Sequence, residues 1–210
     1  GFHCIEHNPN IGGRFSIFSH TSMIPISLFF NNYLDMFKGF ESAISDFLNK
    51  EPVSDDMSPI DIALKKYDLI LSGKRIDIIL LYGDELYEIG NWMKQLYAES
   101  LGKNGYGYLP VISQMTQDQH SVLQLYLDGP NDKLFYIFSY EESSKYRLNV
   151  NQIINKNSYL DKKSLSNIKK AQKNALIKSL YKNKIPFREF KIRTNNEEIL
   201  GKLFSYFICE

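Results

Sequence analysis

Apolar residues follow two periodicities that alternate along this chain, and the alternation limits its fold more than any other feature. Apolar positions three and four residues apart predict helices over 60–71, 86–97, 162–182 and 199–208. Runs rich in β-branched and aromatic residues predict strands over 76–82, 110–114, 133–140 and 186–193. Strands that are each followed by a helix are typical of an α/β domain with a largely parallel sheet.

The connections between these elements indicate where a ligand could bind. Segment 51–59 is expected to be a loop, with Ser58 as the N-cap and Pro59 at the first position of a helix. In parallel sheets, ligands bind beyond the carboxyl ends of the strands. Asp84 and Glu85 follow the first predicted strand, and segment 116–120 follows the second. These two strand ends are therefore candidate functional positions.

Composition excludes several classes of protein. The 210 residues contain 25 Lys and Arg against 24 Asp and Glu, so net charge gives no reason to expect nucleic-acid binding. The basic cluster in 145–193 could form an anion-binding face, and we interpret it as a solvated face. Every apolar run is much shorter than the ~20 residues of a membrane span. Cys4 and Cys209 form neither a disulfide framework nor a metal-ligand set, which favours a reduced, cytoplasmic setting.

Two short motifs contain residues that could bind or attack a polar substrate. In Ile11-Gly-Gly-Arg14, the glycines let the backbone approach a ligand, and the guanidinium can bind an oxyanion through several donors. Glu99 ends an amphipathic helix, where the helix macrodipole mildly disfavours a carboxylate. A tight turn with a solvated arginine and an exposed surface glutamate are the structural alternatives.

Two further motifs contain groups that could carry protons. His120 is expected in the first turn of a short helix, with Asp118 as a possible N-cap. The positive end of a helix favours neutral imidazole, which suits a proton shuttle. Lys202 lies off the apolar stripe of the last predicted helix, where it could simply pair with Glu198 four residues earlier. Each of these residues has a purely structural explanation when it is considered singly.

Considered together, the four motifs resemble the phosphoglucose isomerase family. The matching segments are Gly-Gly-Arg-Phe-Ser, Ala-Glu-Ser-Leu-Gly-Lys, Asp-Gln-His-Ser-Val-Leu-Gln-Leu-Tyr-Leu-Asp-Gly-Pro and Leu-Gly-Lys, between about Ile11 and Lys202. The resemblance implies a sugar-isomerase (SIS) fold, a three-layer αβα sandwich with a mainly parallel sheet. It implies that residues 1–58 lead into a second SIS subdomain formed by 59–210. The first subdomain, with its Ser/Thr-rich phosphate loop, is expected to be absent from the chain.

The resemblance also implies an activity, the reversible conversion of glucose 6-phosphate to fructose 6-phosphate through a cis-enediol, without a metal or organic cofactor. Glu99 matches the base that moves the proton between C1 and C2. Arg14 matches the residue that stabilises the enediolate, and Gly13 lies beside it at the substrate. His120 and Lys202 match the groups that open the sugar ring. In the family this histidine comes from the partner subunit, so a homodimer is expected.

Two other functions stay open at this point. The chain could belong to a non-catalytic SIS module that binds a phosphosugar, or to a bifunctional isomerase that also accepts mannose 6-phosphate. Asn195 stands where many members of the family have a glutamine that binds substrate, and no contact is expected from this shorter side chain. The isolated chain is expected to be nearly inactive because the phosphate loop is not in it.

Overall fold

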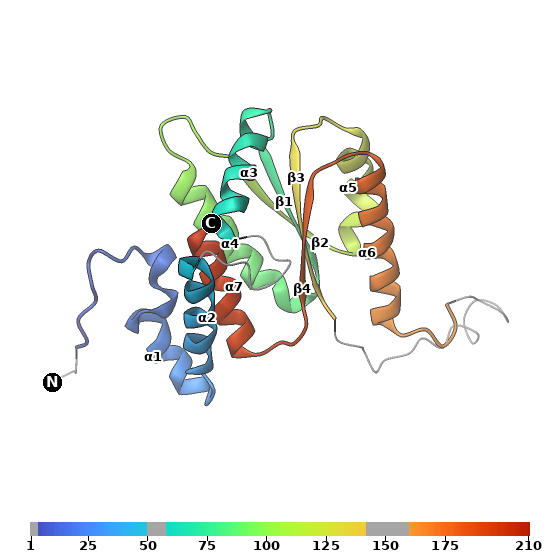
Figure 1. The fold of residues 1–210 in the computed structure, drawn as a ribbon. Helices are drawn as coiled ribbons and strands as arrows, with labels where there is room; N and C mark the ends of the chain where they lie inside the picture. The colour runs from blue at the N-terminus through green and yellow to red at the C-terminus, as the bar shows by residue number, and fades with distance from the viewer. Residues whose placement is uncertain (1–3, 50–57, 142–159) are drawn as a thin grey trace. The chain divides into compact units, whose positions relative to one another are not determined.

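The computed structural model describes residues 4–49, 58–141 and 160–210, which form two compact units (Figure 1). Each unit is assembled from separate stretches of sequence. The first unit comprises Gly1–Gly73, Trp92–Gly107 and Asn195–Glu210. The second unit comprises Lys74–Asn91 and Tyr108–Thr194.

A parallel sheet forms the centre of the second unit. Among the described residues it has four strands, β1 (Ile76–Tyr82), β2 (Leu109–Gln114), β3 (Lys133–Tyr140) and β4 (Phe187–Ile192), in the order β2-β1-β3-β4. Ile76 of β1 lies opposite Leu109 of β2 on one side and Lys133 of β3 on the other. The four predicted strands and their parallel arrangement are therefore confirmed.

Helices cover both faces of this sheet. Helices α5 (Gln117–Asp128) and α6 (Leu165–Lys182) pack on one face and form a single buried cluster with the strands and the β2–α5 turn: Ile78, Leu80, Tyr82, Met115, Tyr126, Phe135, Ile137, Leu176 and Leu180. In β1 and β3, the residues whose side chains point to the other face of the sheet are also buried. That face is therefore covered as well. There Gly90, in the first part of α4 (Tyr87–Leu101), lies against Leu81 and Ile112. The predicted α/β layers are present.

The first unit is helical in its described part. It contains η1 (Gly13–Phe18), α1 (His20–Phe29), α2 (Asp35–Asn49), α3 (Pro59–Leu71), most of α4, and α7 (Glu197–Cys209). As predicted, Ser58 caps α3, and its side chain accepts a hydrogen bond from the backbone nitrogen of Asp61. Lys66 of α3 is buried with its ammonium 3.9 Å from the ring centroid of Tyr97 of α4. This contact joins α3 to the helix that carries Glu99.

Helices α2 and α7 pack closely because each has a glycine at their contact. A Cβ atom at Gly39 of α2 would lie 2.6 Å from the backbone nitrogen of Lys202 and would overlap the carbonyl oxygen of Glu198. A Cβ atom at Gly201 of α7 would overlap the carbonyl oxygen of Met36. No side chain fits at either position, so both glycines are needed for this backbone contact.

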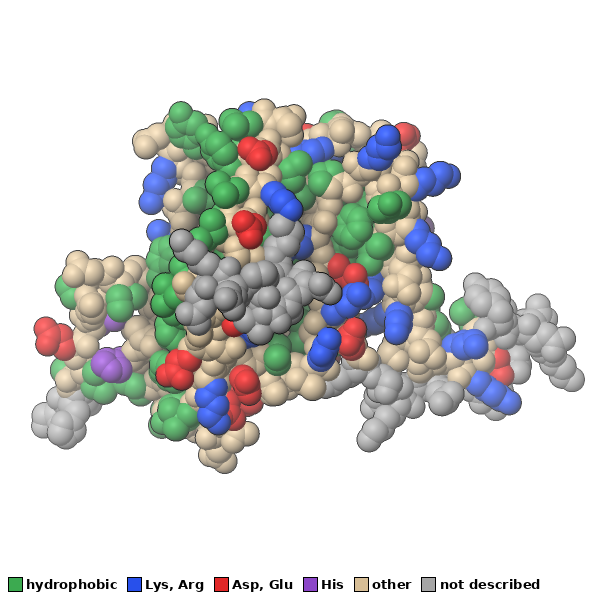
Figure 2. Space-filling model, in the orientation of Figure 1, with side chains coloured by type: hydrophobic (Ala, Val, Ile, Leu, Met, Phe, Trp, Pro, Cys, Tyr) green, Lys and Arg blue, Asp and Glu red, His purple; other side chains and the backbone are tan. Residues whose placement is uncertain are grey.

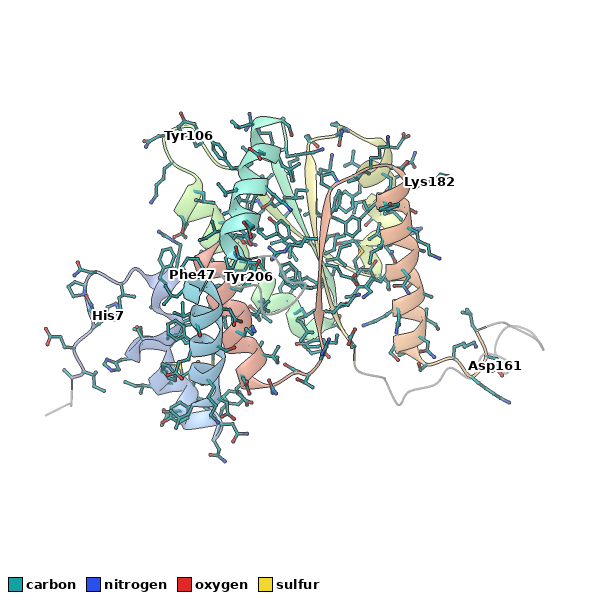
Figure 3. All side chains as sticks on the ribbon, viewed as in Figure 1. His7, Phe47, Tyr106, Asp161, Lys182 and Tyr206 are labelled. Atoms are coloured by element: carbon teal, nitrogen blue, oxygen red, sulfur yellow. The ribbon has the colours of Figure 1, made fainter. Side chains whose placement is uncertain are left out.

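Two apolar surfaces of the first unit are exposed. The stripe predicted over 60–71 forms α3, but Ile60, Leu64, Tyr67 and Leu71 are 43–67% exposed, and Figure 2 shows hydrophobic side chains on this surface. At the end of α1, which the periodicity did not predict, Leu28 and Phe29 are 76% and 81% exposed. Tyr106, in the loop after α4, is 82% exposed (Figure 3). No helix in the described ranges is long and apolar enough to cross a membrane.

Candidate functional site

Arg14 and Glu99 form an ion pair in the first unit. Arg14 lies in η1, directly after the two glycines, and Glu99 lies in the last turn of α4. The guanidinium donates to Oε2 of Glu99 at 2.6 Å, and its Nε donates to Oγ of Ser100 at 3.0 Å. The structure thus brings together two predicted site residues that are 85 positions apart in sequence.

Gln95 binds the second oxygen of the same carboxylate. Its amide, one turn before Glu99 on α4, donates to Oε1 of Glu99 at 3.0 Å. The hydrogen bond from Gln95, followed by that from Arg14, lowers the pKa of Glu99 below its ordinary value. Glu99 is therefore ionised at neutral pH, as a general base must be. Gln95 is not among the residues predicted from the sequence, although its i,i+4 spacing to Glu99 places both on one helix face.

Glycines shape the backbone on both sides of this ion pair. Helix α4 ends at Leu101, and the backbone nitrogen of Gly102 donates to the carbonyl oxygen of Ala98 at 3.0 Å. A Cβ atom at Gly102 would overlap that oxygen, so the helix end beside Glu99 requires glycine. A Cβ atom at Gly13 would meet no atom within 4 Å. The space beside Gly13 is thus open, and its contact with substrate stays a prediction.

Lys202 pairs with an aspartate on another helix of the first unit. Its ammonium lies 3.0 Å from Oδ2 of Asp46 of α2, and the two side chains are 46% and 38% exposed. The intrahelical pair with Glu198 that the sequence suggested is not formed. Among the described residues, no contact joins Lys202 directly to Arg14 or Glu99. Its place in a common site stays a prediction.

His120 belongs to the second unit, where it is exposed as the fourth residue of α5. Its predicted position in the first turn is confirmed. Asp118 as the N-cap is wrong, because Thr116 holds that position. The carboxylate of Asp118 turns back to the end of β2 and accepts hydrogen bonds from the backbone nitrogen of Gln114 at 2.8 Å and from Oγ of Ser113 at 3.0 Å. Asp118 thus fixes the β2–α5 turn that positions His120.

The carboxyl end of β1 contains the other predicted candidates. Asp84 and Glu85 begin the short helix η2 (Asp84–Leu86) and are exposed. Nearby, Gln119 of α5 donates to the hydroxyl of Tyr82 at 3.0 Å, and burial raises the pKa of that phenol. Within the described part of the chain, no cluster of His, Cys, Asp and Glu could hold a metal ion.

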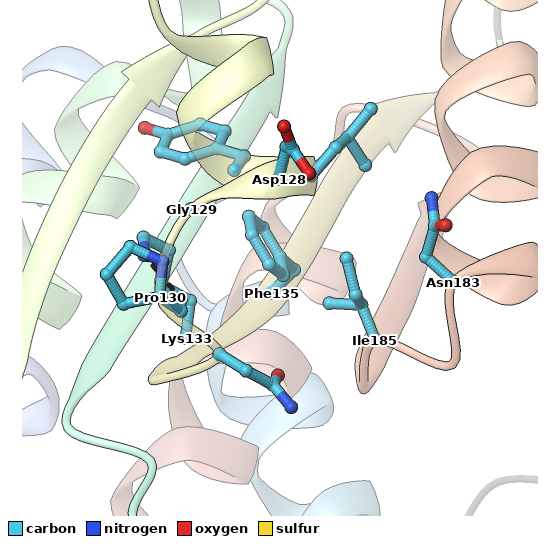
Figure 4. Close-up of a pocket in the computed structure, with 10 residues that line it drawn as sticks. Asp128, Gly129, Pro130, Lys133, Phe135, Asn183 and Ile185 are labelled. Carbon is cyan, nitrogen blue, oxygen red and sulfur yellow. Dashed lines mark hydrogen bonds between the residues drawn. The ribbon is translucent and has the colours of Figure 1, made fainter.

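A pocket of about 290 Å³ opens at the other end of the strands, near the amino end of β3 (Figure 4). Its walls include the end of α5, the loop that follows it, and the connection from α6 to β4, with Tyr126, Pro130, Lys133, Phe135, Asn183 and Ile185. None of the predicted site residues lines this pocket, so it gives no support to the predicted chemistry.

The fold is that of an α/β protein with a parallel sheet, and the site contains a carboxylate held by a guanidinium and an amide. A family model described as phosphoglucose isomerase matches residues 3–203. The chain belongs to the phosphoglucose isomerase family.

Curated relatives carry the corresponding name. A probable glucose-6-phosphate isomerase of Methanococcus maripaludis is 33% identical over 195 residues, which cover 93% of this chain and 43% of the relative. The glucose-6-phosphate isomerase of Methanocaldococcus jannaschii is 32% identical over 199 residues, 92% of this chain and 47% of the relative. The chain therefore spans less than half the length of these two relatives.

Solved structures agree with the fold. A hypothetical protein from Thermus thermophilus matches with a TM-score of 0.75 and 23% identity, over 94% of this chain and 48% of that one. A glucose-6-phosphate isomerase from Chlamydia trachomatis matches with a TM-score of 0.73 and 18% identity, over 96% of this chain and 42% of that one. This likeness confirms the predicted α/β fold with a parallel sheet and helices.

Proposed function

We propose that the protein containing this chain interconverts glucose 6-phosphate and fructose 6-phosphate. The observation that carries the proposal is the ion pair between Arg14 and Glu99, formed in a member of this family by the two motifs whose chemistry the reaction needs. The names of the two curated relatives support the same reaction. Because the chain spans less than half of those relatives, the activity is assigned to the whole protein.

In this proposal Glu99 moves one proton between neighbouring carbons of the open-chain sugar. Its carboxylate takes the proton from C2 of the aldose, and the electrons of the broken C–H bond form the C1–C2 double bond as the C1 carbonyl becomes an alkoxide. The resulting cis-enediolate then receives the proton at C1 from Glu99, while the C2 hydroxyl passes its proton to the C1 alkoxide, so that C2 becomes the carbonyl of the ketose and C1 carries a hydroxyl. Every atom is conserved, and the proposed mechanism uses neither a metal nor an organic cofactor.

Arg14 has two tasks in this mechanism. Before reaction its ion pair with Glu99 keeps the carboxylate ionised, although the lowered pKa makes Glu99 a weaker base. When substrate displaces water, desolvation of the carboxylate raises its basicity. The guanidinium can then turn to the developing charge on the enediolate, and loss of one such donor typically costs ~3 kcal/mol of transition-state stabilisation.

His120, Lys202 and Gly13 complete the proposed site. His120 and Lys202 open the sugar ring through the ring oxygen and the O1 hydroxyl, and Gly13 lies along the substrate. We assign His120 to the site of a partner subunit in a homodimer. Its exposed imidazole, which makes no hydrogen bond within the described ranges, is compatible with that role.

The proposal includes the organisation of the whole protein. Residues 59–210 form the second SIS subdomain, 1–58 lead into it, and the first subdomain supplies the phosphate loop, so the isolated chain turns over little substrate. We also assign the protein to the cytoplasm, a reducing compartment in which cysteines stay unpaired.

The test is Glu99→Gln in the natural protein. We expect kcat to fall about 10²- to 10⁴-fold, because the amide cannot accept the proton, while KM changes little. Formation of glucose 6-phosphate from fructose 6-phosphate is followed by coupled NADP reduction. Glu88→Gln is the matched control, since Glu88 is an exposed glutamate of α4 that accepts a hydrogen bond from the amide of Asn91.

Two outcomes would redirect the proposal. Near-normal turnover by the Glu99→Gln variant would remove Glu99 from the role of base. Binding of glucose 6-phosphate by the unsubstituted protein without turnover would instead indicate a non-catalytic phosphosugar module. The same assay with mannose 6-phosphate tests for the broader specificity.

A further inference from the structure

We propose that Asp46 is the positioning residue for Lys202, holding its ammonium in the direction from which it acts on the sugar ring. This inference rests on the proposed function, in which Lys202 takes part in ring opening. Oδ2 of Asp46 lies 3.0 Å from Nζ of Lys202, and the two residues are 156 positions apart. The contact therefore depends on the tertiary packing of α2 against α7.

The glycine contact between these helices places the two charges together. Gly39 of α2 lies on the backbone of α7 at Glu198 and Lys202. Asp46 follows Gly39 by seven residues, about two helical turns, and so lies on the same side of α2. Lys202 directly follows Gly201, the other glycine of the contact. The short Leu-Gly-Lys motif thus contains both the residue that allows the close approach and the residue that is positioned by it.

Asp46 is the anion that contacts Lys202. Glu198, one turn earlier on α7, makes no ion pair with it, and its charge contributes only slightly to the raised pKa of Lys38, which is due mainly to Asp35. Lys38 and Asp35 form their own pair at 2.6 Å within α2. Among the described residues, Asp46 is therefore the group that restrains Lys202.

The geometry leaves Lys202 able to act. An ammonium has three N–H donors, and Asp46 accepts from one of them, so two remain for oxygens of a substrate. The lysine side chain is 46% exposed, which leaves its end accessible. A long side chain loses conformational entropy when it is fixed, and a contact that restrains it beforehand reduces that cost at the moment of reaction. Asp46 is thus expected to affect kcat more than KM.

The experiment measures kcat and KM for both sugar phosphates in the natural protein carrying Asp46→Asn. We expect kcat/KM to fall roughly threefold to tenfold, mainly through kcat, because the amide keeps the shape but loses the charge. Asp46→Glu, which restores the charge, is expected to recover most of the loss. Asp35→Asn removes a matched Asp–Lys pair of the same helix and is expected to leave the kinetics unchanged.

A double substitution separates positioning from a structural effect. If Asp46 acts through Lys202, Asp46→Asn adds no further loss to a Lys202→Ala protein. An equal loss in both backgrounds would overturn the inference, as would unchanged or increased kcat/KM in Asp46→Asn alone. Melting temperatures of all variants are expected to agree, because both side chains are partly exposed. If the unsubstituted protein does not isomerise glucose 6-phosphate, the proposed function fails and this inference falls with it.

Discussion

At the scale of single residues, the carboxylate of Glu99 has a partner on each oxygen. Arg14 supplies a full positive charge, and Gln95 supplies a neutral amide from the preceding helical turn. Both partners favour the ionised form, so the basicity of Glu99 is set by groups that differ in charge and can be changed separately. Gln95 is the more useful probe, because its removal leaves the ion pair with Arg14 in place.

We predict that Gln95→Ala raises the pKa of Glu99 toward its ordinary value. The hydrogen bond from Gln95 stabilises the ionised carboxylate, and without it Glu99 accepts a proton at higher pH. Carbon-detected NMR titration of glutamate carboxyl groups measures the change, and loss of a signal in Glu99→Gln assigns it. Gln124→Ala, at an exposed position of α5, is the control. An unchanged or lower pKa of Glu99 in Gln95→Ala would contradict the prediction.

The ion pair also shows what could be predicted for single residues. Arg14 and Glu99 were identified through the family resemblance, because spacing alone cannot join positions 85 residues apart. Asp118 was assigned as an N-cap because it lies close to the start of α5, but its carboxylate instead binds the end of β2. The partner of Lys202 could not be predicted either, since Asp46 belongs to a distant helix. The catalytic roles of Glu99, His120 and Lys202 stay predictions.

At the scale of elements, the sequence pattern was most informative for the sheet. The bounds of β1 and β3 agree with the predicted strands, because buried central strands are continuous runs of β-branched and aromatic residues. The contact between α2 and α7 had no such pattern. Two isolated glycines in helical segments do not reveal that they face one another, although that contact decides how close the two backbones lie.

We predict that Gly201→Ala destabilises the protein by about 1–3 kcal/mol, because the new methyl group overlaps the carbonyl oxygen of Met36. Alanine would otherwise favour a helix by about 1 kcal/mol, but backbone on the facing helix cannot move aside as a side chain can. Urea denaturation of the natural protein measures the change. The control is Gly12→Ala, where φ is −66° and a Cβ atom meets nothing within 4 Å. Equal stability of the two variants would refute the overlap.

At the scale of the whole molecule, the exposed apolar side chains of the first unit include a stripe along one helix and are not only scattered single residues. The predicted stripe of α3 is helical, but Leu64 and Leu71 are 60% and 67% exposed. Periodicity shows which face of a helix is apolar, and it does not show whether the chain contains anything to cover that face. For α3 the pattern therefore predicted the element, and the exposure of its apolar face comes from the structure alone.

We predict that the 210-residue chain, expressed by itself, binds a hydrophobic dye such as ANS through this surface. Replacing Leu64 and Leu71 with lysine is expected to reduce dye fluorescence and self-association, because charged groups interrupt the apolar stripe. Tyr106→Lys, at an exposed loop position that is not part of the stripe, is the control. Equal fluorescence of all three proteins would show that α3 does not bind the dye.

The assembly of the first unit from three separate stretches also determines the order in which it can form on the ribosome. The surface of α2 around Gly39 is synthesised early, whereas the backbone of α7 that covers it leaves the exit tunnel only after the intervening strands and helices. A nascent chain that stops before α7 lacks the backbone that packs on Gly39, and it lacks Lys202. Helix α2 must therefore wait for later-synthesised sequence before the first unit is complete.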